Sequence, residues 1–132
     1  MKRAVSTRSG ESFRHSVTVR DHELISDEPE SQGGHDAGPS PQELLAASLA
    51  SCTAITVQMY AERKGWNVGE LSVDVNYEPA QRGSPTKFDL LVHLPKELPE
   101  DQRERLMQIA AKCPVHRTLE SEVMFEEKVE LV

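Results

Sequence analysis

The chain has 132 residues and a formal net charge of −7 at pH 7. This length is typical of one ordinary domain, and it allows a buried core without disulfide staples. The 15 Lys and Arg residues are scattered and form no basic stripe, so nucleic acid and anionic membranes are not expected as partners. We therefore expect one domain spanning residues 1–132.

The N-terminal part of the chain predicts a pair of strands. Residues 13–20, FRHSVTVR, alternate between two faces with the period of a strand. A short turn at Asp21 and His22 then leads to ELIS, the predicted hairpin partner. No apolar stretch follows the first basic residues, so the N-terminus does not resemble a signal peptide, and we expect a cytoplasmic protein.

A loop and a long helix follow. Residues 27–42 are rich in Pro, Gly, Ser and acidic residues, which is typical of a loop. The glycines there predict a flexible loop and not a phosphate cradle, because no basic partner surrounds them. The helix is expected over residues 41–64, where Ser40 is a good N-cap and Glu43 completes a capping box.

This helix contains a long uncharged run from Leu44 to Ala61. The length of the run approaches that of a membrane span. Hydroxyl and amide side chains interrupt it and alanines dilute it, however, so a buried helix is the better interpretation.

The second half of the chain predicts a hairpin, a helix and a closing strand. Residues 71–78 and 87–95 both alternate in strand period, and Pro and Gly residues lie between them. A helix should follow Pro99, and Pro114 should interrupt it or begin a short new helix. Residues 123–132 predict a last strand. Because the strands form hairpins, we expect an α+β fold with an antiparallel sheet.

The two cysteines are the candidates for chemistry. A lone cysteine such as Cys52 on an alanine-rich helix is usually a small buried hydrophobe. Cys113, however, precedes Pro114 and can act as an N-cap, where backbone N–H groups favour a thiolate. A zinc site of Cys52, Cys113 and His116 lacks paired ligand spacing and a fourth ligand, so we expect neither a metal nor another cofactor. His116 could be an acid or base, or simply a surface residue.

Two stretches carry a family resemblance: GGHDAGPSPQELLAASLASCTAITVQMYAERKGW and, later, CPVHRTLE. Together they resemble the OsmC/Ohr family of cysteine-dependent hydroperoxide-reducing proteins, and in particular its OsmC-like branch. The resemblance implies an antiparallel sheet packed on a long central cysteine-bearing helix, in an intertwined homodimer. It also implies a peroxidatic Cys52 that forms a sulfenic acid, a resolving Cys113 that forms a disulfide with it, and a dithiol reductant that restores both.

The resemblance further implies an arginine beside the peroxidatic cysteine and a glutamate that holds this arginine. The family's Arg-x-Gly motif matches Arg8-Ser9-Gly10, so Arg8 is the candidate, with Arg14 and Arg20 as substitutes; an exposed turn arginine is the alternative. In the best-characterised hydroperoxide reductases the glutamate lies ten positions before the cysteine, and Gln42 stands there in this chain. Glu43 takes its place, as in OsmC-like relatives, or it serves only as the capping-box partner.

The spacing of Glu43 and Cys52 bears on the assembly. Nine residues of helix separate these two side chains by about 13 Å and place them on opposite faces. One rigid helix therefore cannot bring them together, which favours a site shared between two chains.

The resulting hypothesis is a thiol peroxidase that acts on organic hydroperoxides. The alternatives are a module that binds a small apolar ligand without catalysis and a redox-sensing dimer.

Overall fold

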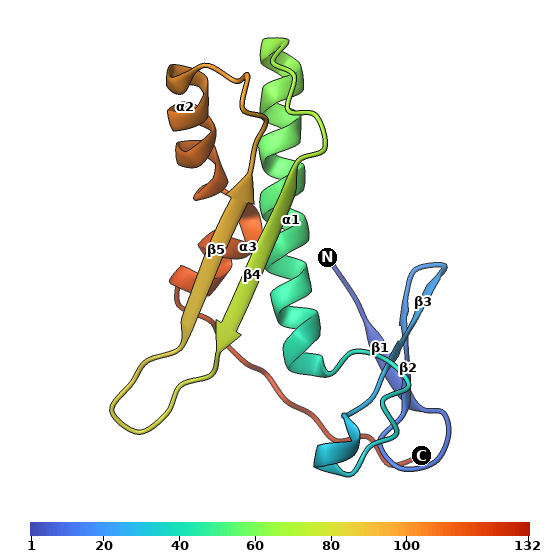
Figure 1. The fold of residues 1–132 in the computed structure, drawn as a ribbon. Coiled ribbons are helices and arrows are strands. Elements are labelled where there is room, and N and C mark those ends of the chain that lie inside the picture. Colours follow the sequence, from blue (N-terminus) through green and yellow to red (C-terminus); the bar gives the residue numbers. More distant parts are fainter. The chain divides into compact units, whose positions relative to one another are not determined.

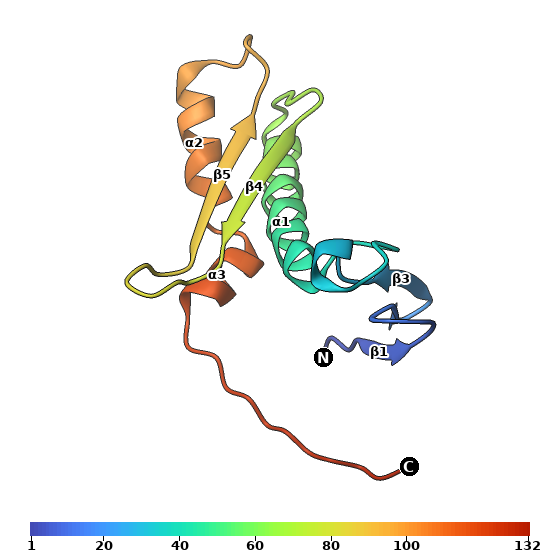
Figure 2. The ribbon, with the colours of Figure 1, turned by 60° about the horizontal axis from the view of Figure 1, so that its bottom comes forward.

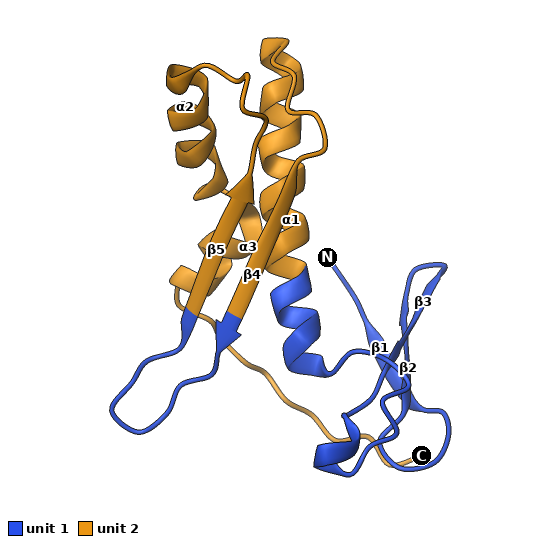
Figure 3. Cartoon of the chain, in the orientation of Figure 1, with its two compact units in different colours: residues 1–47, 77–87 blue, residues 48–76, 88–132 orange.

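The computed structural model describes residues 1–132. The chain folds as two compact units, residues 1–47 with 77–87 and residues 48–76 with 88–132 (Figure 3). The single domain expected over residues 1–132 stays a prediction.

A three-stranded antiparallel sheet forms the N-terminal part. It consists of β1 (Val5–Arg8), β2 (His15–Val19) and β3 (His22–Ser26), in that order. The register pairs Val5 with Thr18 and His15 with Ser26. The predicted β2–β3 hairpin is confirmed. The sequence did not predict β1, because its four residues are mostly exposed and show no apolar alternation.

The loop after β3 is tied down at Asp27, and it contains the short 3-10 helix η1 (Glu30–Gln32). The buried carboxylate of Asp27 accepts backbone N–H groups from Glu28 at 2.8 Å, His35 at 3.2 Å and Ala37 at 3.1 Å. A Cβ at Gly34 would collide with the carbonyl of Glu28. This glycine therefore serves a close backbone approach, which corrects the expectation of a merely flexible loop.

The long helix α1 spans Pro41–Lys64, as the sequence predicted. Its capping box is present: the Ser40 N–H donates to Glu43 Oε1 at 2.9 Å, and the Glu43 N–H donates to Ser40 Oγ at 3.2 Å. The buried residues recur every four positions, as expected for one helix face: Leu49, Thr53, Val57 and Ala61.

By length and composition alone, α1 could cross a membrane. Its Val57 and Ala61 are instead fully buried in a core cluster with residues of α2 (Glu100–Ala110). We therefore identify α1 as a core helix of the fold.

A hairpin and this core complete the second half of the chain. The strands β4 (Ser72–Glu78) and β5 (Lys87–His93) pair in a two-stranded sheet, as predicted, and run beside α1 in both views (Figures 1 and 2). Each strand has one half-buried and one exposed face. The core cluster consists of Val57, Ala61, Val68, Leu98, Leu106 and Ala110.

The fold is therefore α+β, with antiparallel sheets and a long helix packed on them. Two differences from expectation stand out. The strands form two sheets and not one, and the predicted closing strand over residues 123–132 is wrong. These residues are extended but form no ladder (Figure 2), and Phe125 and Leu131 are 82% and 93% exposed. An alternating pattern makes a strand only where a sheet edge accepts its hydrogen bonds, and no strand of this chain pairs with residues 123–132.

Candidate functional site

Cys113 is fixed by the start of a short helix. It is the N-cap of α3 (Pro114–Glu120), with Pro114 as the first helical residue, as the sequence predicted. Its sulfur accepts the backbone N–H of His116 at 3.3 Å, and the residue is completely buried. The side chain of Cys113 therefore replaces the hydroxyl that usually caps a helix.

Cys52 faces the same short helix from the middle of α1. It is half-buried, and its sulfur accepts the backbone N–H of Val115 at 3.5 Å. The hydroxyl of Thr56, one helical turn further on, lies near enough to this sulfur to lower its pKa. The start of α3 thus lies against α1 at Cys52.

The structure brings the two thiols together. Cys113 caps the same helix whose Val115 N–H reaches the Cys52 sulfur at 3.5 Å, and both cysteines are free. The hydroxyl of Thr53 also reaches Cys113, with 3.8 Å between Oγ1 and Sγ. Both cysteines belong to the unit formed by residues 48–76 and 88–132. The arrangement can support chemistry in which one sulfur attacks the other.

The surroundings of Cys52 have opposing effects on the pKa of its thiol. Burial raises the pKa of the Cys52 thiol, and the hydrogen bond and charge of Cys113 raise it further, whereas the N–H of Val115 and the hydroxyl of Thr56 lower it. The net effect is upward. Since the thiolate is the nucleophilic form, these surroundings disfavour the reactive state of Cys52.

The other predicted site residues belong to the unit of residues 1–47 and 77–87. Arg8 is the last residue of β1 and is exposed, and Arg14 and Arg20 are exposed as well. Glu43 makes the capping-box contacts with Ser40, and these hydrogen bonds lower the pKa of its carboxyl. A role for Arg8 or Glu43 beside the Cys52 thiolate therefore stays a prediction.

The structure shows no set of side chains that could bind zinc at Cys52, Cys113 and His116. No group of three or more His, Cys, Asp or Glu side chains converges in a way that could hold a metal ion. His116 Nδ1 lies 2.8 Å from Glu120 Oε1, one turn along α3.

Sequence reasoning missed the groups that hold the two sulfurs, namely Thr53, Thr56 and the N–H of Val115. The spacing of four residues between Cys52 and Thr56 could have indicated that these two side chains are neighbours, since residues four apart lie on the same face of a helix. Nothing local could have indicated the contacts between α1 and α3, because they join segments far apart in the chain.

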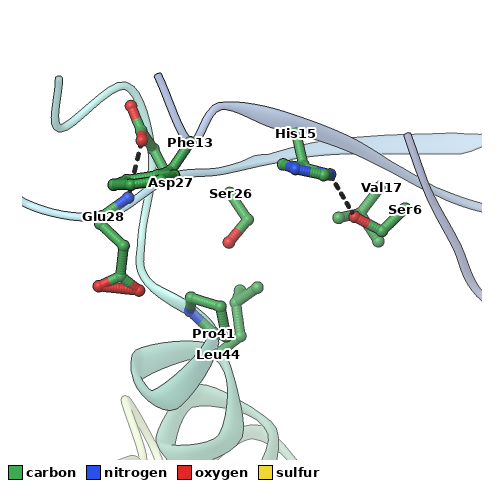
Figure 4. Close-up of a pocket in the computed structure, with 9 residues that line it drawn as sticks. All are labelled: Ser6, Phe13, His15, Val17, Ser26, Asp27, Glu28, Pro41 and Leu44. Carbon is green, nitrogen blue, oxygen red and sulfur yellow. Dashed lines mark hydrogen bonds between the residues drawn. The ribbon is translucent and has the colours of Figure 1, made fainter. Parts of the chain in front are cut away.

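A separate cavity of about 530 Å³ lies between the N-terminal sheet and the start of α1, and it contains no cysteine (Figure 4). Its apolar lining includes Phe13, Val17 and Leu44. Among its polar residues, His15 lies within hydrogen-bond distance of Ser6, with 3.1 Å between Nδ1 and Oγ.

Comparison with known proteins identifies similar folds. The family model described as OsmC-like protein matches residues 33–128. No curated protein matches the chain.

Several solved structures cover most of the chain. A Psychrobacter arcticus 273-4 protein assigned to the osmotic stress and detoxification response superposes with a TM-score of 0.76 at 24% identity, over 89% of this chain and 88% of that one. The organic hydroperoxide resistance protein OsmC of Legionella pneumophila gives 0.65 at 21% identity, over 90% and 88%. The organic hydroperoxide resistance protein OhrB of Bacillus subtilis gives 0.59 at 20% identity, over 89% of each chain.

Proposed function

The chain belongs to the OsmC-like protein family, and from this premise we propose that it is a thiol-dependent peroxidase that reduces organic hydroperoxides. The observation that carries the proposal is that Cys113 caps the helix whose Val115 N–H binds the Cys52 sulfur, so that two free thiols from distant parts of the chain lie at one contact between α1 and α3. The solved structures named for organic hydroperoxide resistance, from Legionella pneumophila and Bacillus subtilis, support the substrate class.

The proposed reaction has three steps. The Cys52 thiolate attacks the O–O bond of the hydroperoxide, so that Cys52 becomes a sulfenic acid and an alcohol leaves after taking up a proton. The Cys113 thiolate then attacks the Cys52 sulfur, which forms the disulfide and releases the hydroxyl as water. A dithiol reductant exchanges with this disulfide and restores both thiols. This dependence on a dithiol fits a cytoplasmic protein.

A cation is needed to favour the Cys52 thiolate against its burial. We propose Arg8 for this role, oriented by Glu43, with both supplied by a second copy of the chain. The spacing along α1 supports a shared site, because one helix cannot bring Glu43 to its own Cys52. Exposed apolar side chains on α1 support the homodimer: Ile55 and Met59 are 55% and 56% exposed.

The test is turnover of cumene hydroperoxide with dithiothreitol as reductant. Wild-type protein should consume the peroxide, and Cys52→Ser should not. After an equimolar addition of peroxide without reductant, the intact mass should fall by two hydrogens, and peptide mapping should find a Cys52–Cys113 bond. A wild-type protein that consumes no peroxide and keeps both thiols would refute the proposal.

A second candidate function is binding of a small apolar ligand without catalysis. The observation that favours it is the cavity of about 530 Å³ lined by Phe13, Val17 and Leu44 (Figure 4). A raised pKa at Cys52 is also compatible with a thiol of low reactivity. Fatty acid extracted from the purified protein, together with absence of peroxide turnover, would decide for this function.

A further inference from the structure

A hydroxyl group stands in the apolar face of α1 beside the two cysteines. The buried residues of this face are Leu49, Thr53, Val57 and Ala61, and three of the four are aliphatic. Thr53 is completely inaccessible to solvent. A buried hydroxyl costs free energy unless it has a hydrogen-bond partner, and the partner of this hydroxyl is the sulfur of Cys113, 3.8 Å away.

The Cys113 sulfur is held from two sides. The Thr53 hydroxyl reaches it from α1, and the backbone N–H of His116 donates to it from α3 at 3.3 Å. Thr53 is adjacent to Cys52 in sequence, so the same helical turn that carries one sulfur also holds the other. Rotation of the Cys113 side chain away from Cys52 would break both hydrogen bonds.

We propose that Thr53 is a positioning residue for Cys113, which holds its sulfur as a hydrogen-bond acceptor beside Cys52 for the disulfide-forming step. This inference rests on the proposed function. In that step the Cys113 thiolate forms a bond to the Cys52 sulfur, the S–O bond of the sulfenic acid breaks, and the departing hydroxyl takes up a proton and leaves as water. The Thr53 hydroxyl contributes to this step by fixing where the attacking sulfur lies.

The peroxide-reducing step does not use this contact. It requires the Cys52 thiolate, whose sulfur accepts the N–H of Val115 and not the hydroxyl of Thr53. Loss of the Thr53 hydroxyl should therefore slow the second step and leave the first unchanged.

Two substitutions separate positioning from packing. Thr53→Val keeps the shape of the side chain and removes the hydroxyl, whereas Thr53→Ser keeps the hydroxyl and removes a methyl group. In single-turnover experiments with cumene hydroperoxide, both variants should form the Cys52 sulfenic acid at the wild-type rate. Thr53→Val should then close the disulfide about tenfold more slowly, as expected for one lost hydrogen bond to a charged group. Thr53→Ser should close it at nearly the wild-type rate.

A purely structural role predicts the reverse order, because the serine variant leaves a small cavity and the valine variant does not. Thermal unfolding of the reduced proteins reports the packing effect separately. Thr18→Val, an exposed substitution on β2, controls for the loss of a hydroxyl elsewhere. Disulfide closure in Thr53→Val at the wild-type rate would overturn the inference.

A measurement without peroxide keeps this inference distinct from the proposed function. Ellman's reagent can convert Cys52 to a mixed disulfide with thionitrobenzoate, and attack of Cys113 on the Cys52 sulfur then forms the Cys52–Cys113 bond and releases the thionitrobenzoate anion. Release of this anion should be slower in Thr53→Val than in wild-type protein, and an equal rate would count against Thr53. Lack of peroxide turnover in wild-type protein, in contrast, would count against the proposed function alone.

Discussion

At the scale of single residues, the two cysteines differ in their surroundings. Cys113 is completely buried at the cap of α3, whereas Cys52 is half-buried on α1. In the proposed reaction, the less buried residue is the better candidate to meet a peroxide, and the fully buried one is placed to react with its neighbour. This difference supports the assignment of Cys52 as the peroxidatic and Cys113 as the resolving cysteine.

Cys113→Ser should therefore stop the reaction after its first step. One addition of cumene hydroperoxide should leave a sulfenic acid on Cys52, because no second thiol is available to displace its hydroxyl. Intact mass should rise by one oxygen atom, and dimedone should trap the product. The double variant Cys52→Ser/Cys113→Ser is the control and should show no adduct. An oxygen adduct that maps to a methionine instead of Cys52 would contradict this assignment.

Asp27 is the residue on which the loop before α1 depends. Burial alone would raise the pKa of its carboxyl, but the N–H groups of Ala37, Glu28 and His35, together with the charge of His35, hold this pKa below its ordinary value of 3.8. Asp27→Asn should lower the midpoint of thermal unfolding, because the amide nitrogen cannot accept an N–H as the second carboxylate oxygen does. Asp36→Asn, an exposed change in the same loop, should have little effect.

The same residue predicts a direction of pH dependence. Because the pKa of Asp27 is lower in the folded state, its ionised form stabilises the fold at all pH values above the ordinary value, and this contribution is lost as the pH falls through the folded-state pKa. Wild-type protein should lose stability between these limits, and Asp27→Asn should lose less over the same range. If the free energy of unfolding falls equally in the two proteins as the pH is lowered through this range, the Asp27 carboxylate is not the cause of the loss of stability.

At the scale of elements, substitutions in the capping box of α1 can separate an effect on folding stability from an effect on peroxidase activity. Ser40→Ala removes the hydroxyl that accepts the Glu43 N–H at 3.2 Å, and it should cost about 1 kcal/mol of folding stability. Glu43→Gln removes the charge, but its amide oxygen can still accept the Ser40 N–H as Glu43 does at 2.9 Å, so unfolding by urea should change less.

Peroxidase assays of the same two variants test the proposed role of Glu43. If its carboxylate orients Arg8, Glu43→Gln should lower the rate of Cys52 oxidation more than Ser40→Ala does. Equal and small effects on that rate would leave Glu43 as a helix cap only.

The sequence predicted the elements whose signals are local. The cap of Ser40 and Glu43 predicted α1 at its observed bounds, and one of the two outcomes expected at Pro114 was the short helix α3 with Cys113 as its N-cap. Three features were missed or wrong because they depend on distant partners. The strand β1 exists through pairing with β2, residues 123–132 pair with no strand of the chain, and Thr53 meets Cys113 only because α3 lies against α1.

At the scale of the whole molecule, exposed apolar surface is the feature that a second copy would explain. The tail after α3 carries several such side chains, including Met124, Phe125 and Val129, which are 85%, 82% and 89% exposed. The outer face of α1 adds Ile55 and Met59. Exposed apolar residues in such numbers are typical of protein interaction sites, and the strand-like pattern of the tail suits pairing with another chain.

Ile55→Asp tests whether the outer face of α1 belongs to the dimer interface. The side chain is 55% exposed in the single chain, so the charge should leave the fold intact, whereas burial of an unpaired carboxylate between two chains is costly. Light scattering at micromolar concentration should therefore give half the wild-type mass. Met107→Asp, at a 49% exposed position on α2, should leave the mass unchanged. If Arg8 of one copy serves Cys52 of the other, the dissociated variant should also oxidise Cys52 more slowly. A monomeric variant with the full wild-type rate would show instead that each chain carries a complete site.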